Sequence, residues 1–192
     1  GASLSGAGAA SENRIAARVQ SYIQGDMDGK GIKAASVSVG ADDTSAIESF
    51  TAGLSIAAAF GAGGIAASIG VGIAFNTIDV DVEAFVKDVD DAGIDTTAGE
   101  IRIEANEDAT IQAFAGAASI GVGAGGIGGA LSGAGAFASN VIQGSALAHA
   151  DDSDLDSHGD VVLLATNDAT IRAEVLALSA AVGIGAAAGA GL

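Results

Sequence analysis

The amino-acid sequence predicts an all-β chain that folds as an elongated β-solenoid or a flattened β-roll of three tandem repeats. Three observations predict this fold class. Apolar and polar residues alternate strictly in many segments, the sequence repeats itself with a period of about 62 residues, and small side chains dominate the composition. We expect one continuous solenoid that belongs to a longer array.

The composition argues against an ordinary compact core. Hydrophobic residues make up 49% of the 192 residues, but aromatic residues make up only 4% and glycine occupies 30 positions. Most of the apolar share is alanine, which buries little area, and burial stabilises by only about 25 cal/mol per Å². Small side chains instead suit thin layers that are ordered by backbone hydrogen bonds and repeated stacking.

Two anchors define the repeats. Asn13, Asn76 and Asn140 lie 63 and 64 positions apart, and the alternating pattern that follows each of them keeps the same phase. The hexapeptide that starts at Leu4 recurs letter for letter at Leu131. We therefore expect these positions to be equivalent in successive repeats.

A third anchor is an isoleucine. Ile47, Ile111 and Ile171 lie 64 and 60 positions apart. Leu192 falls where Leu131 stands in the preceding repeat, so the chain is expected to hold close to three whole units. The predicted boundaries of these units are residues 4–66, 67–130 and 131–192.

The first repeat begins with a segment that fits two patterns. Ile15, Val19 and Ile23 form a stripe at helical spacing. The aligned segment Ile78–Val86 of the second repeat instead places an apolar residue at nearly every second position, between acidic side chains. We extend the strand interpretation from the second repeat to the first.

Later segments alternate with the same period of two. Ile101–Ala105 and Ala169–Val175 are therefore predicted to be half-buried strands. The side chains expected to face the interior and to stabilise it are Ile78, Val80, Val82, Ile101, Ile103, Ile111, Ile171 and Val175.

Three uncharged stretches rich in glycine and alanine are residues 49–78, 109–150 and 175–192. Their length raises the alternative of membrane helices, which need about 18 or more apolar residues and pack closely through glycine. Paired glycines such as Gly63 and Gly64 argue against helices, because each costs about 1 kcal/mol in a helix interior. Closely packed strands are preferred, and both several coils per unit and a flattened roll of long strands stay open.

The net charge excludes several classes of partner. A formal charge of −17 repels phosphate backbones and no Lys/Arg cluster offsets it, so nucleic acid is not an expected partner. The absence of cysteine excludes disulfides and thiolate metal sites. No GxxxxGK[ST] motif occurs, and no small-molecule substrate is expected.

Acidic turns are the candidate metal sites, because oxygen-rich clusters suit calcium. Residues 152–156 lack the glycine that an EF-hand needs at its sixth position, and Leu163 stands where its glutamate would be. Aspartate is also common in turns for backbone reasons, so solvated turns are the preferred interpretation and no cofactor is assigned. The weak calcium candidates are Asp88, Asp90, Asp91, Asp152, Asp154 and Asp156.

The chain has two histidines, His149 and His158. His149 aligns with Tyr22 and Phe85 at an outward position of a strand. No GxSxG or comparable signature places a nucleophile beside either imidazole. We predict that the chain is not an enzyme and has no catalytic residues.

Alternating strands, acidic turns and Gly/Ala runs such as residues 117–127 recur together in the three units. In this the chain resembles the repeat regions of very large bacterial surface proteins, the filamentous-haemagglutinin-like and leukotoxin-family filamentous adhesins. The resemblance implies a secreted protein, located at the bacterial cell surface or in an extracellular matrix. It also implies a right-handed β-helical stalk.

The expected function is that of a noncatalytic structural or adhesive stalk segment. Its expected partners are neighbouring repeats, through head-to-tail association, and a host or matrix surface. A membrane-active protein that inserts its Gly/Ala segments is the alternative. A binder of an ordered surface such as ice or a polysaccharide is a further alternative, although Thr77, Thr110 and Thr170 predict no rank of outward threonines.

Overall fold

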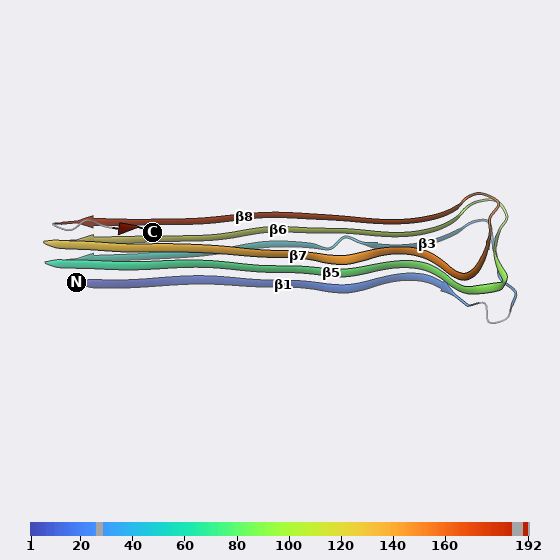
Figure 1. Cartoon of the computed structure of the whole chain (residues 1–192), viewed down its shortest axis with the longest axis horizontal. Coiled ribbons are helices and arrows are strands. Elements are labelled where there is room, and N and C mark those ends of the chain that lie inside the picture. Colours follow the sequence, from blue (N-terminus) through green and yellow to red (C-terminus); the bar gives the residue numbers. More distant parts are fainter. Residues whose placement is uncertain (26–28, 186–189, 192) are drawn as a thin grey trace.

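The computed structural model describes residues 1–25, 29–185 and 190–191, and within them the secondary structure is entirely β (Figure 1). The longest strands run the length of the molecule, with the turns gathered at its two ends. The strands are β1 (Ala2–Gln24), β2 (Ile32–Ala34), β3 (Val37–Asp43), β4 (Ala46–Phe60), β5 (Gly63–Thr96), β6 (Ile101–Ala124), β7 (Ile127–Asp156), β8 (Val161–Ile184) and β9 (Ala190–Gly191).

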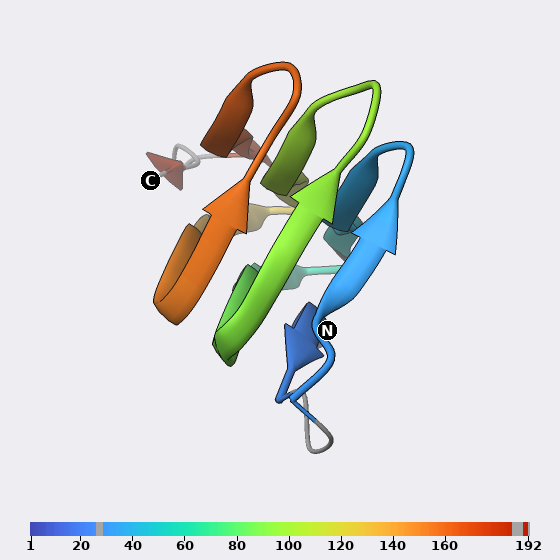
Figure 2. The same cartoon turned by 90° about the vertical axis from the view of Figure 1, so that its right-hand side faces the viewer.

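The strands form two sheets in which every neighbouring pair is parallel. In the first sheet β5 lies between β1 and β7, β2 also pairs with β5, and β9 pairs with β7. In the second sheet β6 lies between β8 on one side and β3 with β4 on the other. Figure 2 shows the sheets as two layers, joined by loops that carry the chain from one layer to the other. The chain runs along one layer and returns along the other, which supplies the crossover that parallel strands require.

The register places the predicted anchors side by side. Asn13 is the partner of Asn76, and Asn76 is the partner of Asn140. Ile111 lies between Ile47 and Ile171 in the second sheet. The fold is thus all-β with parallel sheets, consistent with a β-solenoid or roll. The chain passes along the first sheet, returns along the second, and does so three times; we call each such pair of passes a circuit.

The ambiguous first segment is a strand. It belongs to β1, and Ile15 pairs with Ile78 as the alignment predicts. The helical stripe is therefore incidental. Pairing along the whole length of β1 outweighs a local pattern that either structure could accommodate.

The alignment of Leu192 with Leu131 is wrong. Leu131 pairs with Ala190, and Leu192 lies outside the described residues. The third circuit is shorter than the second, because the register shifts between Val89 and Ile94 of β5. This irregularity removes residues from the third circuit, and the offset between equivalent positions decreases accordingly.

A hydrophobic core fills the space between the sheets near the charged end of the molecule. The predicted inward residues of the middle circuit are fully buried: Ile78, Val80, Val82, Ile101, Ile103 and Ile111. Ile171 and Val175 were also predicted to be core residues, and this is wrong, since they are 48% and 50% exposed. Both keep the inward phase, but no described strand beyond β8 covers them.

The two sheets approach more closely along their other half. A methyl group added to Gly72 would overlap the carbonyl oxygen of Gly116 in the opposite sheet. Buried serines bridge the narrow interior, and the hydroxyl oxygens of Ser119 and Ser132 are 2.7 Å apart. Small side chains therefore fill the inside of this half, which leaves its large apolar side chains on the outside.

An asparagine ladder links the three circuits. The Nδ2 of Asn13 donates to Oδ1 of Asn76 at 2.8 Å, and the Nδ2 of Asn76 donates to Oδ1 of Asn140 at 2.7 Å. The sequence left open whether these asparagines form a ladder or occupy left-handed turns. They lie within strands β1, β5 and β7, and the ladder gives the buried amide of Asn76 a partner on both sides.

Candidate functional site

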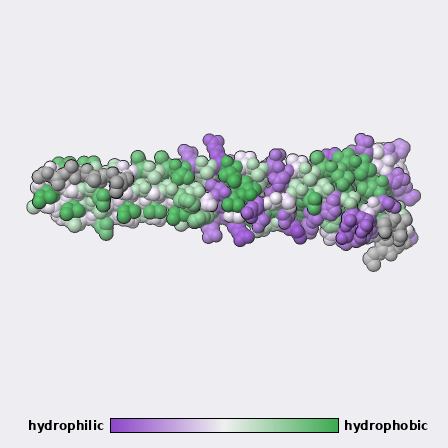
Figure 3. Space-filling model, viewed as in Figure 1, coloured by the Kyte–Doolittle hydropathy of each residue, from purple (hydrophilic) through white to green (hydrophobic). Residues whose placement is uncertain are grey.

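Charge divides the molecule along its length (Figure 3). One half carries no Asp, Glu, Lys or Arg, and we call it the uncharged half. The hydroxyls of Ser11 on β1 and Thr51 on β4 are hydrogen-bonded, so the charge-free parts of the two sheets lie at the same level. The uncharged half comprises residues 2–11, 49–60, 63–76, 113–124, 127–140 and 175–184.

The outer faces of the uncharged half are apolar and exposed. On the second sheet Phe50, Leu54 and Leu178 are 76%, 61% and 65% exposed. On the first sheet Leu4 and Ile69 are likewise exposed. Scattered apolar side chains are ordinary on a protein surface, but a contiguous face of them marks an interaction site. None of the described segments is a helix long and apolar enough to span a membrane.

Phenylalanines mark the boundary between the charged and uncharged halves. The rings of Phe50 and Phe114 stack across neighbouring strands of the second sheet, with centroids 4.9 Å apart. On the first sheet Phe75 and Phe137 form a tilted pair with centroids 5.7 Å apart. These pairs add to the rigidity of the surface at the point where polar side chains give way to apolar ones.

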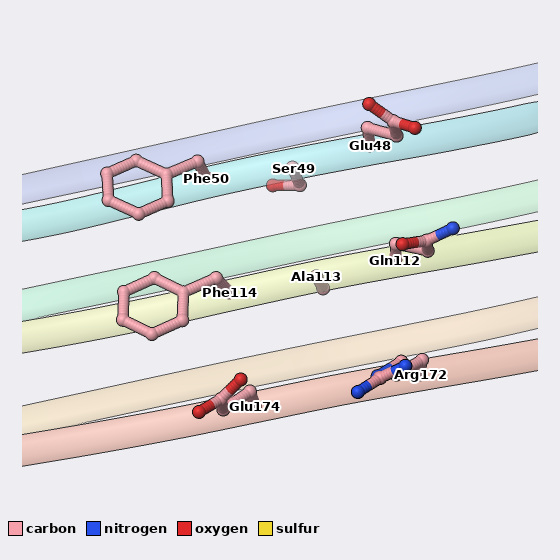
Figure 4. A pocket seen from close by; sticks show the side chains of 8 residues that line it. All are labelled: Glu48, Ser49, Phe50, Gln112, Ala113, Phe114, Arg172 and Glu174. Carbon is pink, nitrogen blue, oxygen red and sulfur yellow. The ribbon is translucent and has the colours of Figure 1, made fainter.

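A hollow of about 440 Å³ lies at this boundary on the second sheet (Figure 4). Phe50, Phe114 and Glu174 occupy one column of outward side chains. The adjacent column holds Glu48, Gln112 and Arg172. No histidine lines the hollow, and Ser49 belongs to the inward face of its strand. Its lining combines one cation with two acids and two stacked rings. The lining residues are Glu48, Ser49, Phe50, Gln112, Ala113, Phe114, Arg172 and Glu174.

A second hollow, of about 280 Å³, continues from Phe114 into the uncharged half. Leu54, Leu176 and Leu178 form its walls together with Phe114, and Gly116 belongs to its floor. The glycine matters here, because a Cβ at this position would collide with the Phe114 ring. The missing side chain thus creates an apolar depression on an otherwise flat face.

The histidines are not brought into a catalytic arrangement. His149 stacks on Phe85, which stacks on Tyr22, with centroids 5.2 and 5.0 Å apart. This agrees with the predicted equivalence of the three positions. The hydroxyl of Ser145 donates to Asp81 at 2.7 Å, and neither histidine contacts it through a described hydrogen bond.

The calcium candidates lie within strands β5 and β7, and the side chains of Asp88 and Asp152 are exposed. Asp88 and Asp152 adopt left-handed backbone conformations, with φ of 56° and 44°, at equivalent places in two circuits. Aspartate tolerates this conformation, which supports the turn interpretation. Asp154 and Asp156 are exposed, and the described residues include no group of three or more acidic or histidine side chains placed to hold a metal. Asp90 and Asp91 are residues of strand β5, and the structure describes their backbone but not their side chains.

The sequence analysis missed a buried carboxyl group. Glu107 is 2% exposed and lies in the second sheet between Asp43 and Asn167. Its Oε2 accepts a hydrogen bond from Asn167, while its Oε1 has no partner. A Cβ at Gly144 in the opposite sheet would collide with that oxygen, so the glycine makes room for the carboxyl.

The pKa of Glu107 is raised, chiefly because burial disfavours its charged form and further because Asp43 and Asp81 are negative. The signal in the sequence was its place in the inward phase of the Ile101–Ile111 alternation. An acid at an inward position of a strand predicts a buried carboxyl, and Glu107 stands at such a position.

Replacing Glu107 by glutamine should stabilise the protein at pH 7 by about 1–3 kcal/mol, because it removes a charge that burial and the nearby Asp43 and Asp81 disfavour. The Glu107 carboxyl holds its proton more tightly in the folded state than in the unfolded chain. The stability of the wild type is therefore fully present below the unfolded-state pKa of Glu107, and it falls as the pH rises through the raised pKa of the folded state. The gain should therefore shrink as the pH falls towards about 4. Thermal unfolding of Glu107→Gln and wild type across this pH range measures it.

The exposed Glu12 supplies a matched control. Glu12→Gln removes the same formal charge without relieving a buried carboxyl, and it should change stability by less than about 0.5 kcal/mol at any pH in the range. Equal gains from the two substitutions would show that general charge repulsion, and not burial of Glu107, sets the pH dependence.

No protein-family model, curated protein or solved structure matches the chain. The similarity to filamentous adhesins therefore stays a hypothesis.

Proposed function

We propose that the chain is a noncatalytic structural segment of a secreted filament or adhesin, in which the three circuits are tandem repeats of a flattened, right-handed β-solenoid. The observation that carries the proposal is the open edge at the third circuit. Ile171 and Val175 point inward yet remain half exposed, and among the described residues β8 has a strand neighbour on one side only. A further circuit would cover both side chains and pair with the free edge.

The same edge supports the proposed partners. An equivalent circuit, from a neighbouring repeat or from a second chain stacked head to tail, offers the complementary edge of β1 and β4. Each added circuit extends the stack by about 4.8 Å and is as wide as the strands are long. The assembly is therefore a broad ribbon. Each added repeat increases its exposed outer surface much more than it increases the length of the filament.

The location and the adhesive role rest on the resemblance to bacterial surface adhesins and on the net charge of −17, which favours solubility at high local concentration. Binding of ice or another ordered surface gains no support. Thr110 pairs with Thr170, but Thr77 lies in the other sheet between Arg14 and Val141, so the three threonines form no rank.

A tandem fusion of two copies tests the proposal. Leu4, Ala67, Leu131 and Ala190 are successive register partners, so Ser5 of the second copy should follow Ala190 of the first. If circuits propagate, the amides of β8 in the first copy become protected from hydrogen exchange and the melting midpoint rises above that of the single chain. If the two copies in the fusion fold independently, with β8 of the first copy unprotected and the melting midpoint of the single chain unchanged, the proposal is overturned.

The control fusion carries Ile171→Lys and Val175→Lys in its first copy. Inward-pointing charges at an edge oppose strand addition, so this fusion should keep the exchange rate of the single chain. Both positions are half exposed, and circular dichroism of the single chain with the same substitutions checks that it still folds.

A further inference from the structure

We infer that the outer face of the second sheet, within the uncharged half, packs against the same face of a second copy in antiparallel orientation. The proposal concerns the flat side of the molecule. It goes beyond the stacking of circuits at their edges and does not depend on it.

The face has the chemistry of an interface. Its outward residues in β4, β6 and β8 are uncharged from Phe50, Phe114 and Leu176 to the end of each strand. Several of the largest among them are more than half exposed: Phe50, Leu54, Ile56, Phe60, Leu176, Leu178 and Ile184.

The area of the face reaches the lower limit for a biological interface. Eleven residues of strand extend about 36 Å and three strands span about 14 Å, so the face offers roughly 500 Å². Two copies would bury about 1,000 Å² in total, the minimum expected of a biological interface with good complementarity. The depression over Gly116, walled by Leu54 and Leu178, receives an apolar side chain of the partner and turns a flat contact into an interlocking one.

Charge fixes the orientation. In a parallel pair the charged halves of two chains, each with a net charge of −17, would lie side by side. In an antiparallel pair they project from opposite ends and are separated by the uncharged overlap of about 36 Å, several times the screening length of about 8 Å at physiological salt. Such a pair is a closed twofold dimer, in which each face is its own complement.

A second copy suits the face better than lipid does. Strands β1, β4 and β8 each lack a neighbour on one side within the described chain, so their edge N–H and C=O groups would enter hydrocarbon unpaired. Each such group costs several kcal/mol in a bilayer. A face-to-face protein pair leaves these edges in water.

Single cysteines test the inference, because the chain has none of its own. Ile120 lies near the middle of the face on the central strand, so Ile120→Cys on two paired copies should be joined by a short bismaleimide. Gln112→Cys on the same strand would be about 46 Å from its mate in the antiparallel pair and should not be joined. Ile69→Cys on the opposite outer face is the matched negative control.

Sedimentation of Ile120→Glu supplies the second measurement. The parent should sediment as a dimer and the variant as a monomer with an unchanged β spectrum, since the side chain is on the surface. Crosslinking at both positions 120 and 112 would overturn the antiparallel orientation, and crosslinking at neither would overturn the pairing. Flotation of the parent with phosphatidylcholine vesicles would make lipid the occupant and overturn the inference too. Protection of β8 in the tandem fusion, together with no crosslink at position 120, would refute face pairing and leave the proposed function intact.

Discussion

Replacing Ile111 by aspartate should unfold the middle circuit and with it the whole chain. Ile111 is a fully buried member of the core cluster and lies between Ile47 and Ile171 on the neighbouring strands. Loss of its side chain alone costs about 2–5 kcal/mol, and an unpaired buried carboxylate adds several more. Because domains of this kind are stable by only about 5–15 kcal/mol, the variant should show little or no cooperative unfolding transition at pH 7.

The matched control is Ile171→Asp. This residue has the same inward phase one circuit further on, but it is 48% exposed, so its aspartate can stay hydrated. Urea unfolding followed by circular dichroism should give a loss of about 1–2 kcal/mol for this variant. An Ile111→Asp protein that unfolds at the wild-type urea concentration would refute the inward face and hence the assignment of the core.

Gly72→Ala should destabilise the protein by about 3 kcal/mol, the upper end of overpacking effects. The added methyl group would overlap the carbonyl oxygen of Gly116, and a backbone atom held in a sheet cannot move aside as a side chain would. The sheets must therefore separate locally, which also strains the serine bridges that cross the interior. Thermal and urea unfolding both measure the loss.

Gly135→Ala is the matched control for this substitution. Gly135 lies in the same sheet, one circuit further on, and pairs with Val71, but a methyl group there would meet no atom within 4 Å. Alanine in a strand interior is favoured over glycine, so this variant should gain about 0.5 kcal/mol. Effects of the same sign at both positions would show that the close approach of the sheets does not constrain Gly72.

Much of the fold follows from alternation and self-similarity. The phase read from Ile78–Val86 identified the buried side of β5, and the spacing of the asparagines gave the register of the first sheet. These succeed because a strand has a fixed period of two, and because parallel stacking places equivalent residues side by side. The exposure of Ile171 could not be read in the same way, since it depends on what lies beyond the strand.

The functional surface was harder to predict. Within the Gly/Ala stretches alternation continues, but with the large apolar residues outward and serine or glycine inward, as at Ile120 and Ser119. Alternation with a period of two divides the residues of a strand between its two faces, but it does not indicate which face is buried. The usual assumption that the larger apolar side chains are inside fails here, because the close approach of the sheets admits only small ones.

The pairing of β1 with β5 has a mechanical consequence. Their ladder extends over all 23 residues of β1 without a shift in register. Backbone hydrogen bonds between parallel strands run across the strands, along the direction in which circuits are stacked. Tension applied evenly along that direction loads all hydrogen bonds of the ladder together, so they must break in one event. The same force applied at one end of a strand breaks the bonds one at a time. The molecule should thus resist an even pull along the stacking direction and separate readily when it is pulled at one end of a strand.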